Sequence, residues 1–527
     1  MNLSDLPWLE ASIAVMLVGA LCVSQVRHPV RAYGWGRAFT GAACACAVLA
    51  CLSYYLGGPH GSAVGGPQER LFGRQVFELD AVNAPLLPAV ALLHFLTALA
   101  TARTKMRRFS FSWSLAAGAI RLATFSCTDP GVLVSLLVAD TIPPYVELLN
   151  RGSPTRVYVL HMVLFVGLLT GGWALLRAAG GGAAPPAGAG ALLLAAVLIR
   201  CGTVPAHCWV TDWFEHASFG IALLAVAPLA GVYAGVRLVL PVAPDWALRG
   251  AAVASLVTAV YAAAMATVQR EVRRFFAYLF LSHASLVLAG LELHSDISLT
   301  GALCLWFSVI ISLGGFGLTL RALESRFGWL SLAEYRGLYE HTPALAVCFL
   351  LTGLASVGFP GTLGFISTEL LVDGVVNVNL YAGLCVIAAA ALNGIAVVRA
   401  YFLLFTGARH VSTVSLGIGL RERAAVLTLA ALILGGGLFP QPGVATRQKA
   451  AEEILDGRRK RLPPPASPGG RSTSRRRPTI KDSERTRPPR PSSSRAPTAR
   501  SATAWRQREL RGAAPAISDP SPRRASA

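Results

Sequence analysis

Residues 199–237 read IRCGTVPAHCWVTDWFEHASFGIALLAVAPLAGVYAGVR, and the rest of the chain is organised around this stretch. An apolar segment ends at Arg200, a polar turn follows around His207, and a second apolar segment contains Pro228. Charge inside a membrane span is costly and usually functional, and proline is tolerated where neighbouring groups satisfy the freed backbone. The pattern predicts a buried cation beside a broken helix, as an ion pathway requires. In the alternative interpretation, Arg200 extends its charge to the membrane surface.

The composition indicates an integral membrane protein. Of the 527 residues, 54% are hydrophobic and 14% are charged, a balance typical of chains that cross a membrane many times. A span needs about 20 apolar residues. We therefore expect an all-α polytopic membrane protein with about 14 transmembrane helices, two or more of them broken. The first apolar segment starts near Leu9 without a small-residue cleavage site behind it, so we expect a retained helix.

The positive charge is concentrated at the C-terminus. Residues 457–527 carry 19 Lys and Arg against 4 Asp and Glu, so they hold +15 of the net charge of +20. With many Pro, Ser and Arg and few aliphatic residues, residues 446–527 are expected to form a basic disordered tail. Such a tail is a translated frameshift product, an electrostatic attachment to the membrane surface or solvated disorder. Nucleic acid is not an expected partner.

The sequence offers no pattern for a redox or metal centre. The ten cysteines lie singly in apolar segments, and the closest three (Cys44, Cys46 and Cys51) lack histidine or carboxylate neighbours, so neither zinc nor a disulfide framework is indicated. There is no Gly-rich dinucleotide loop after a strand and no iron–sulfur spacing. We expect no cofactor and no metal on this chain.

A second interrupted segment, residues 358–376, reads GFPGTLGFISTELLVDGVV. Glu369 and Asp373 lie one helical turn apart in it, and two carboxylates so close raise the pKa of one of them. Two broken segments with charge inside the membrane are typical of transporter sites. This predicts a relay at Glu369, whereas Asp373 either joins it or is simply solvated at the interface.

Two more polar residues lie inside predicted spans. Asp140 precedes the pair Pro143-Pro144, which interrupts helical hydrogen bonding, so its carboxylate either belongs to a site or accepts from freed backbone amides. His283 lies in a helix predicted over 275–292 and either relays protons or bonds across helices. Arg273 and Arg274, at the start of that helix, mark the cytoplasmic side.

Five segments carry recognisable motifs: LDAVNAPL (79–86), TDPGVLVSLLVADTIPPY (128–145), VPAHCWVTDW (204–213), QREVRRFFAYLFLSHAS (269–285) and GFPGTLGFISTELL (358–371). Together they resemble the antiporter-like membrane subunits of NADH:quinone oxidoreductase (complex I), and most closely the M subunit. The resemblance implies a fourteen-helix protein that carries protons through buried lysines, glutamates and water. It places a translocation core at 79–405, with N-terminal helices and a loop at 1–78 and a C-terminal helix at 406–445.

The resemblance also implies the surroundings of the chain. We expect a multi-pass protein of the cell inner (plasma) membrane that contacts lipid and the other membrane subunits of a complex I-like assembly. Quinone would be met only through that assembly. Whether the chain counts as part of an enzyme is open, because any oxidoreductase activity would belong to the assembly and not to this subunit.

The family's ionisable positions are only partly kept. The buried lysine of helix 7 falls on Arg200, which keeps the charge but cannot release a proton. The glutamate of helix 5 falls on Val138, two residues before Asp140, and the lysine of helix 8 falls on Leu229. The terminal glutamate falls on Thr368 or on Glu369 itself, one residue away, while His283 matches directly. His207, Trp209 and Asp212 are expected to shape the turn after Arg200.

Two functions follow. In the first, protons or another cation move along a path through Arg200, Glu369, Asp140 and His283. In the second, the chain is a degenerate, non-conducting anchor for a partner subunit, as the changes at Val138 and Leu229 suggest. Related Mrp antiporters, membrane-bound hydrogenases and inorganic-carbon uptake complexes share the scaffold, so membership of one of these is a further alternative.

Overall fold

The computed structural model describes residues 6–57, 73–102, 105–107, 109–180, 185–293, 295–407 and 419–461. Within these ranges the regular elements are helices, accompanied by two isolated β-bridges, Phe77–Cys127 and Glu271–Ser331. The helices are α1 (Trp8–Ser24), α2 (Pro29–Gly57), α4 (Leu86–Leu99), α5 (Phe111–Ser126), α6 (Pro130–Ala139), α7 (Ile142–Arg151), α8 (Arg156–Ala178), α9 (Ala187–Cys201), α10 (Cys208–His216), α11 (Phe219–Val226), α12 (Ala230–Ala234), the π-helical turn η3 (Gly235–Val239), α13 (Asp245–Val268), α14 (Val272–Glu292), α15 (Asp296–Phe327), α16 (Pro343–Ser356), α17 (Leu363–Val378), α18 (Leu380–Phe405), α19 (Leu420–Leu438) and α20 (Gln441–Arg461).

Many of these helices can cross a membrane. By length and composition, eight helical segments of the described residues are long and apolar enough, and a ninth results if α19 and α20, bent by 79°, are counted as one span. Four shorter apolar helices (α1, α4, α9 and α16) accompany them. Backbone polar groups must be satisfied internally in lipid, which favours helices. The predicted all-α polytopic fold with broken helices is confirmed.

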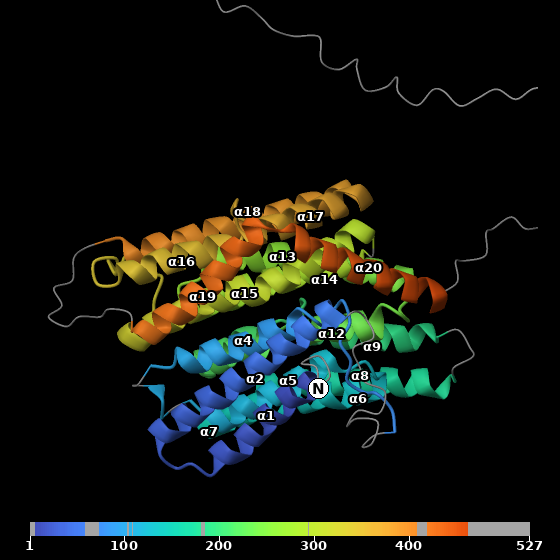
Figure 1. Ribbon diagram of the computed structural model, residues 1–527. Coiled ribbons are helices and arrows are strands. Elements are labelled where there is room, and N and C mark those ends of the chain that lie inside the picture. The colour runs from blue at the N-terminus through green and yellow to red at the C-terminus, as the bar shows by residue number, and fades with distance from the viewer. Residues whose placement is uncertain are drawn as a thin grey trace, which may run out of the picture. The chain divides into compact units, whose positions relative to one another are not determined.

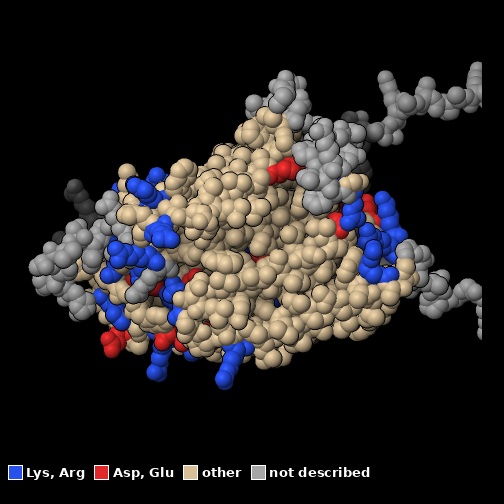
Figure 2. All heavy atoms as spheres, turned by 90° about the horizontal axis from the view of Figure 1, so that it is seen from below, with Lys and Arg blue, Asp and Glu red and all other residues tan. Residues whose placement is uncertain are grey.

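The helices run side by side in one bundle. Figure 1 shows α1 to α9 in one half and α13 to α20 in the other, with α12 between them. The long helix α15 packs against α14, α16, α17, α19 and α20, and its apolar stretch is 94% buried. In Figure 2 the Lys and Arg side chains gather toward the two ends of the helices, and other residues cover most of the surface between. This distribution matches a protein whose flank faces lipid and whose ends face water.

The predicted interruptions occur where proline and glycine lie. Helix α6 ends at Ala139 and α7 begins at Ile142, next to Pro143-Pro144. Helix α11 ends just before Pro228, and Leu229 has a left-handed backbone with φ of 56°. The break between α16 and α17 contains Gly358 and Gly361, both at positive φ, which glycine adopts without steric cost.

The C-terminal boundary differs from the prediction. Residues 446–461 were expected to start a disordered tail, but they belong to α20, so that part of the prediction is wrong. Arg447, 3% exposed, donates to the Val82 carbonyl at 2.8 Å, and Arg458, 7% exposed, donates to the Ala243 carbonyl at 2.9 Å. The buried side of α20 combines these two arginines with Ala450, Ala451 and Leu455, and hydropathy does not detect a buried face that contains arginine. Residues 462–527 lie outside the described part.

Candidate ion-translocation site

The break between α6 and α7 positions Asp140 in the interior. Asp140 caps the C-terminus of α6 and is 0% exposed. Its Oδ2 accepts a hydrogen bond of 2.7 Å from Nη2 of Arg200 on α9, and its Oδ1 lies 3.1 Å from Nε of Arg121 on α5. Three helices that are separated in sequence thus meet at one carboxylate. We call Arg121, Asp140 and Arg200 the charge cluster.

Arg200 is held inside the protein by the turn that follows it. Helix α9 ends at Cys201, its capping residue Gly202 has a φ of 77°, and the chain then continues into α10. Trp209 donates its indole N–H to the Ile199 carbonyl at 2.9 Å, and the Arg200 guanidinium lies 5.5 Å from the Trp209 ring centroid. The side chain of Arg200 is 7% exposed, so the alternative in which it reaches the membrane surface is wrong.

The other residues predicted to shape this turn lie along its outer side. The ring of His207 lies 5.3 Å from that of Tyr261, edge to face. Asp212 Oδ1 lies 3.3 Å from Nδ1 of His216 within α10. Neither His207 nor Asp212 touches the charge cluster through these contacts, which agrees with a role in the turn.

Sequence reasoning missed Arg121. It is the one charged residue in the sequence of α5, FSWSLAAGAIRLATFS, and is 2% exposed. An isolated charge in an apolar span is itself a functional signal, so the same rule that singled out Arg200 applies to Arg121. Two guanidinium groups and one carboxylate give the charge cluster a formal charge of +1 in a region where unpaired charge is costly.

Asp140 is the only protonatable member of the charge cluster. Guanidinium does not lose its proton in proteins, so Arg121 and Arg200 act as fixed positive charges. The aligned position, Val138, lies on another side of the helix and packs partly buried against the core. A two-residue step turns an α-helix by about 200°, which explains why Asp140 and not Val138 faces Arg200.

Leu229 lies close to Arg200 but contributes no charge. It lines a small cavity together with Arg200, Trp209 and Gly231, at the left-handed residue that separates α11 from α12. The position that resembles the family's helix-8 lysine is therefore an apolar wall beside the charge cluster.

His283 is bonded across helices. It is 3% exposed, its Nδ1 lies 2.8 Å from the Leu279 carbonyl oxygen, and its Nε2 lies 2.7 Å from the Ser356 carbonyl oxygen at the end of α16. Carbonyl oxygens only accept hydrogen bonds, and a neutral imidazole has one N–H. Both contacts are satisfied together only in the doubly protonated ring. His283 thus ties α14 to the break between α16 and α17.

Glu369 lies apart from the charge cluster. Glu369 and Asp373 are both exposed on α17, and the amide of Asn377 donates to Asp373 at 3.3 Å. The opposite face of α17 packs on α15, where Leu371 and Gly374 are buried. Helical periodicity therefore turns both carboxylates outward. The structure brings Arg200 and Asp140 together and leaves Glu369 and His283 elsewhere in the bundle.

A second buried carboxylate, Glu147 on α7, was also missed. It is 5% exposed, its Oε1 lies 2.6 Å from Nε of Arg151, and it accepts a 3.2 Å hydrogen bond from the Ser218 backbone N–H. A glutamate four residues before an arginine resembles an ordinary surface pair. Burial by α11 distinguishes it, and only the tertiary structure shows that.

Comparison with known proteins places this site in a family context. Residues 185–393 match the family described as NADH:quinone oxidoreductase/Mrp antiporter, transmembrane. The chain is 30% identical over 192 residues to NADH-quinone oxidoreductase subunit M of Rickettsia bellii, covering 36% of this chain and 39% of that relative. It is 25% identical over 509 residues to NAD(P)H-quinone oxidoreductase chain 4 1 of a Nostoc species, covering 88% and 94%. The match to the Rickettsia subunit thus spans about two fifths of its length.

The fold agrees with a solved structure. A chain of respiratory complex I from Thermus thermophilus superposes with a TM-score of 0.76 at 21% identity, covering 85% of this chain and 99% of that chain. The family match, the bacterial relatives and the apolar helices show a multi-pass protein of the bacterial inner membrane. The match to the NADH:quinone oxidoreductase/Mrp antiporter transmembrane family thus covers residues 185–393 of the chain.

Proposed function

We propose that this chain is a membrane subunit of a complex I-like NADH:quinone oxidoreductase and that it moves protons, or another cation, while electron transfer takes place in partner subunits. The observation that carries the proposal is the charge cluster, in which buried Asp140 lies between Arg121 and Arg200 where α6 and α9 end beside α5. The family match and the curated relatives support the assembly.

The chemistry of the charge cluster fits a gate for positive charge. When Asp140 is ionised, it neutralises one of the two guanidinium groups, and when it binds a proton the cluster carries +2. Two unpaired cations in a low-dielectric interior repel each other strongly. Uptake of a proton at Asp140 therefore favours movement of an arginine or release of the proton. The neighbouring breaks in α6/α7 and α9/α10 supply backbone that can accommodate such movement.

The exposed carboxylates of α17 are an argument for a neighbouring subunit in the membrane. Glu369 and Asp373 are exposed on a helix of the apolar bundle, and a carboxylate facing lipid is costly. A neighbouring membrane subunit that brings a cation to this face of α17 would remove that cost. In this arrangement Glu369 connects the chain to its neighbour rather than to Arg200.

A second function, that of a non-conducting anchor, is favoured by one observation. Both cations of the charge cluster are arginines and the nearby position 229 is leucine, so neither the charge cluster nor position 229 supplies a titratable amine. A fixed ion cluster of this kind can hold helices in register without passing protons.

Proton flux in proteoliposomes containing the purified assembly separates the two. We expect wild type to conduct, Asp140→Asn and Arg200→Ala to lose most of the flux, and Glu369→Gln to reduce it. Asp245→Asn is the matched control, since Asp245 is 56% exposed at the start of α13. Assembly is checked by the subunit composition of each preparation, and replacing the proton gradient by a sodium gradient identifies the cation. Wild type without flux above empty liposomes, or all variants at the wild-type rate, would overturn conduction.

A further inference from the structure

A polar cavity opens at one end of the bundle. It lies where α7 and α10 end and where α11 and α14 begin, and water molecules can occupy about 270 Å³ of it. Arg151, Glu215, Arg273 and Glu324 are among the residues that line it. We call it the vestibule. Arg273 lies on the side that the positive-inside rule assigns to the cytoplasm.

Glu147 contacts two residues of the vestibule wall without lining the vestibule itself. Both of its partners, Arg151 and Ser218, line the vestibule. Glu147 itself lines a second, deeper cavity together with Arg121 of the charge cluster. One carboxylate thus contacts the wall of the vestibule and shares a cavity with a member of the charge cluster.

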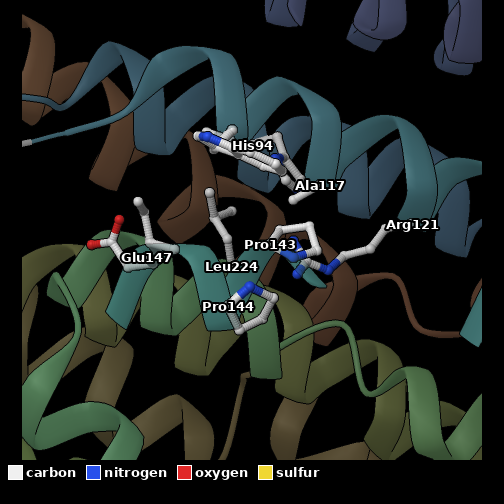
Figure 3. Close-up of a pocket in the computed structure, with 10 residues that line it drawn as sticks. His94, Ala117, Arg121, Pro143, Pro144, Glu147 and Leu224 are labelled. Atoms are coloured by element: carbon white, nitrogen blue, oxygen red, sulfur yellow. The ribbon is translucent and has the colours of Figure 1, made fainter. Parts of the chain in front are cut away.

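The deeper cavity, shown in Figure 3, contains a histidine without a partner. Glu147 and Arg121 lie at its two ends in this view, and His94, from α4, lies between them across from Pro143 and Pro144. His94 is 1% exposed, and neither of its ring nitrogens has a hydrogen-bond partner within the protein. Unsatisfied buried polar atoms are rare, and ordered water is the usual partner where protein supplies none.

The size of the deeper cavity suits one water molecule. About 10 Å³ of it admits the centre of a water molecule. One water needs about 10–15 Å³ by this measure, together with 2–4 polar partners. The volume reaches the lower end of this range, and His94, Ser114, Arg121 and Glu147 are the polar residues among those that line the cavity.

We propose that the deeper cavity binds a water molecule which, with Glu147 and His94, connects the vestibule to the charge cluster. A neutral imidazole has one acceptor nitrogen and one N–H. A proton passed from the Glu147 carboxyl through the water binds the acceptor nitrogen, and the proton on the other nitrogen leaves on the side of the charge cluster, whose Arg121 lines the same cavity. Glu147 becomes a carboxylate, and the ring is neutral again. The relay role rests on the proposed function, whereas the hydration of His94 does not.

Hydration is tested on the wild-type assembly without any flux measurement. X-ray radiolysis in ¹⁸O-labelled water oxidises side chains beside bound water, and mass spectrometry then reads the label at each histidine. His283 is the matched control, because it is equally buried but both of its ring nitrogens contact carbonyls. We expect several-fold faster labelling of His94 than of His283. Equal rates would show that His94 is dry and would overturn the proposal.

The relay is tested by flux through the same assembly. Positioned proton transfer contributes on the order of 10²–10⁴-fold, so we expect His94→Phe and Glu147→Gln each to lower proton flux at least tenfold. His161→Phe is the control: His161, on α8, already contacts the Val157 carbonyl through Nδ1 at 2.8 Å. Wild-type flux with unchanged rates in His94→Phe would overturn the relay alone. Absence of wild-type flux would overturn the proposed function, and the labelling ratio would still decide whether the site holds water.

Discussion

Replacing Asp140 by asparagine tests the charge cluster directly. The side chain keeps its shape but loses its charge, so Arg121 and Arg200, only 2% and 7% exposed, become two cations without a counter-ion. The asparagine oxygen accepts from one guanidinium at most. Its NH₂ group then faces the other guanidinium, donor against donor.

The expected cost follows from the two contacts that are lost. The Asp140 carboxylate lies 2.7 Å from the Arg200 guanidinium and 3.1 Å from the Arg121 guanidinium. Removing one partner of a buried ion pair costs about 3–5 kcal/mol, because the remaining charge is left uncompensated. We therefore expect Asp140→Asn to lower the free energy of unfolding by about 3–5 kcal/mol.

The assay is SDS-induced unfolding of the purified protein in detergent, compared with Asp245→Asn. Asp245 pairs with Arg458, but it is 56% exposed, and Arg458 keeps its hydrogen bond to the Ala243 carbonyl. Exposed pairs contribute about 0–1 kcal/mol. Adding Arg121→Met to Asp140→Asn removes one of the two orphaned cations and should restore part of the loss. Equal effects of the two Asp→Asn variants would refute the reasoning.

Three further predictions concern the surroundings of the site. Arg200→Lys should keep a cation at the charge cluster but add a titratable group, so proton flux measured from pH 5 to pH 10 should gain a pH-dependent step that wild type lacks. Gly231→Ala should destabilise the protein by about 1–3 kcal/mol in thermal unfolding, because an added Cβ would lie 2.6 Å from the Cys201 sulfur; an unchanged midpoint would contradict the packing described. Arg447→Ala should cost about 1–3 kcal/mol by leaving the Val82 carbonyl without its donor, and limited proteolysis should then release α20 faster than in wild type.

Local features of the structure could be predicted from local sequence. Asp129 caps α6 by accepting from the Val132 N–H at 2.9 Å, with Pro130 in the first helical position, as the motif Thr-Asp-Pro predicts. The breaks beside Pro143-Pro144 and Pro228 follow from the missing N–H and the fixed φ of proline. Local sequence also indicated Arg200 as a candidate for burial, because a lone charge in an apolar span is usually functional, but it left a position at the membrane surface open.

The composition of the site could not be predicted in the same way. Hydropathy and helix signals depend on residues within a few turns, whereas an ion pair depends on how each helix is rotated against its neighbours. Asp140 was a candidate from the sequence. Its pairing with Arg200, 60 residues away, depends on how α6 is rotated about its axis relative to α9. Glu369 was expected near the path, but it is exposed. The small and apolar side of α17 packs against α15, and this packing turns Glu369 away from the interior.

The sequence by itself thus determined the membrane-spanning, all-helical architecture and the places where helices break, because apolar length, proline and glycine act locally on the backbone. Only the tertiary structure decided that Arg121 joins Arg200 at Asp140, that His283 bonds to the end of α16, and that His94 and Glu147 share a cavity. These juxtapositions arise when helices far apart in the chain pack together, and close packing of whole surfaces, rather than any single motif, fixes the rotation of each helix.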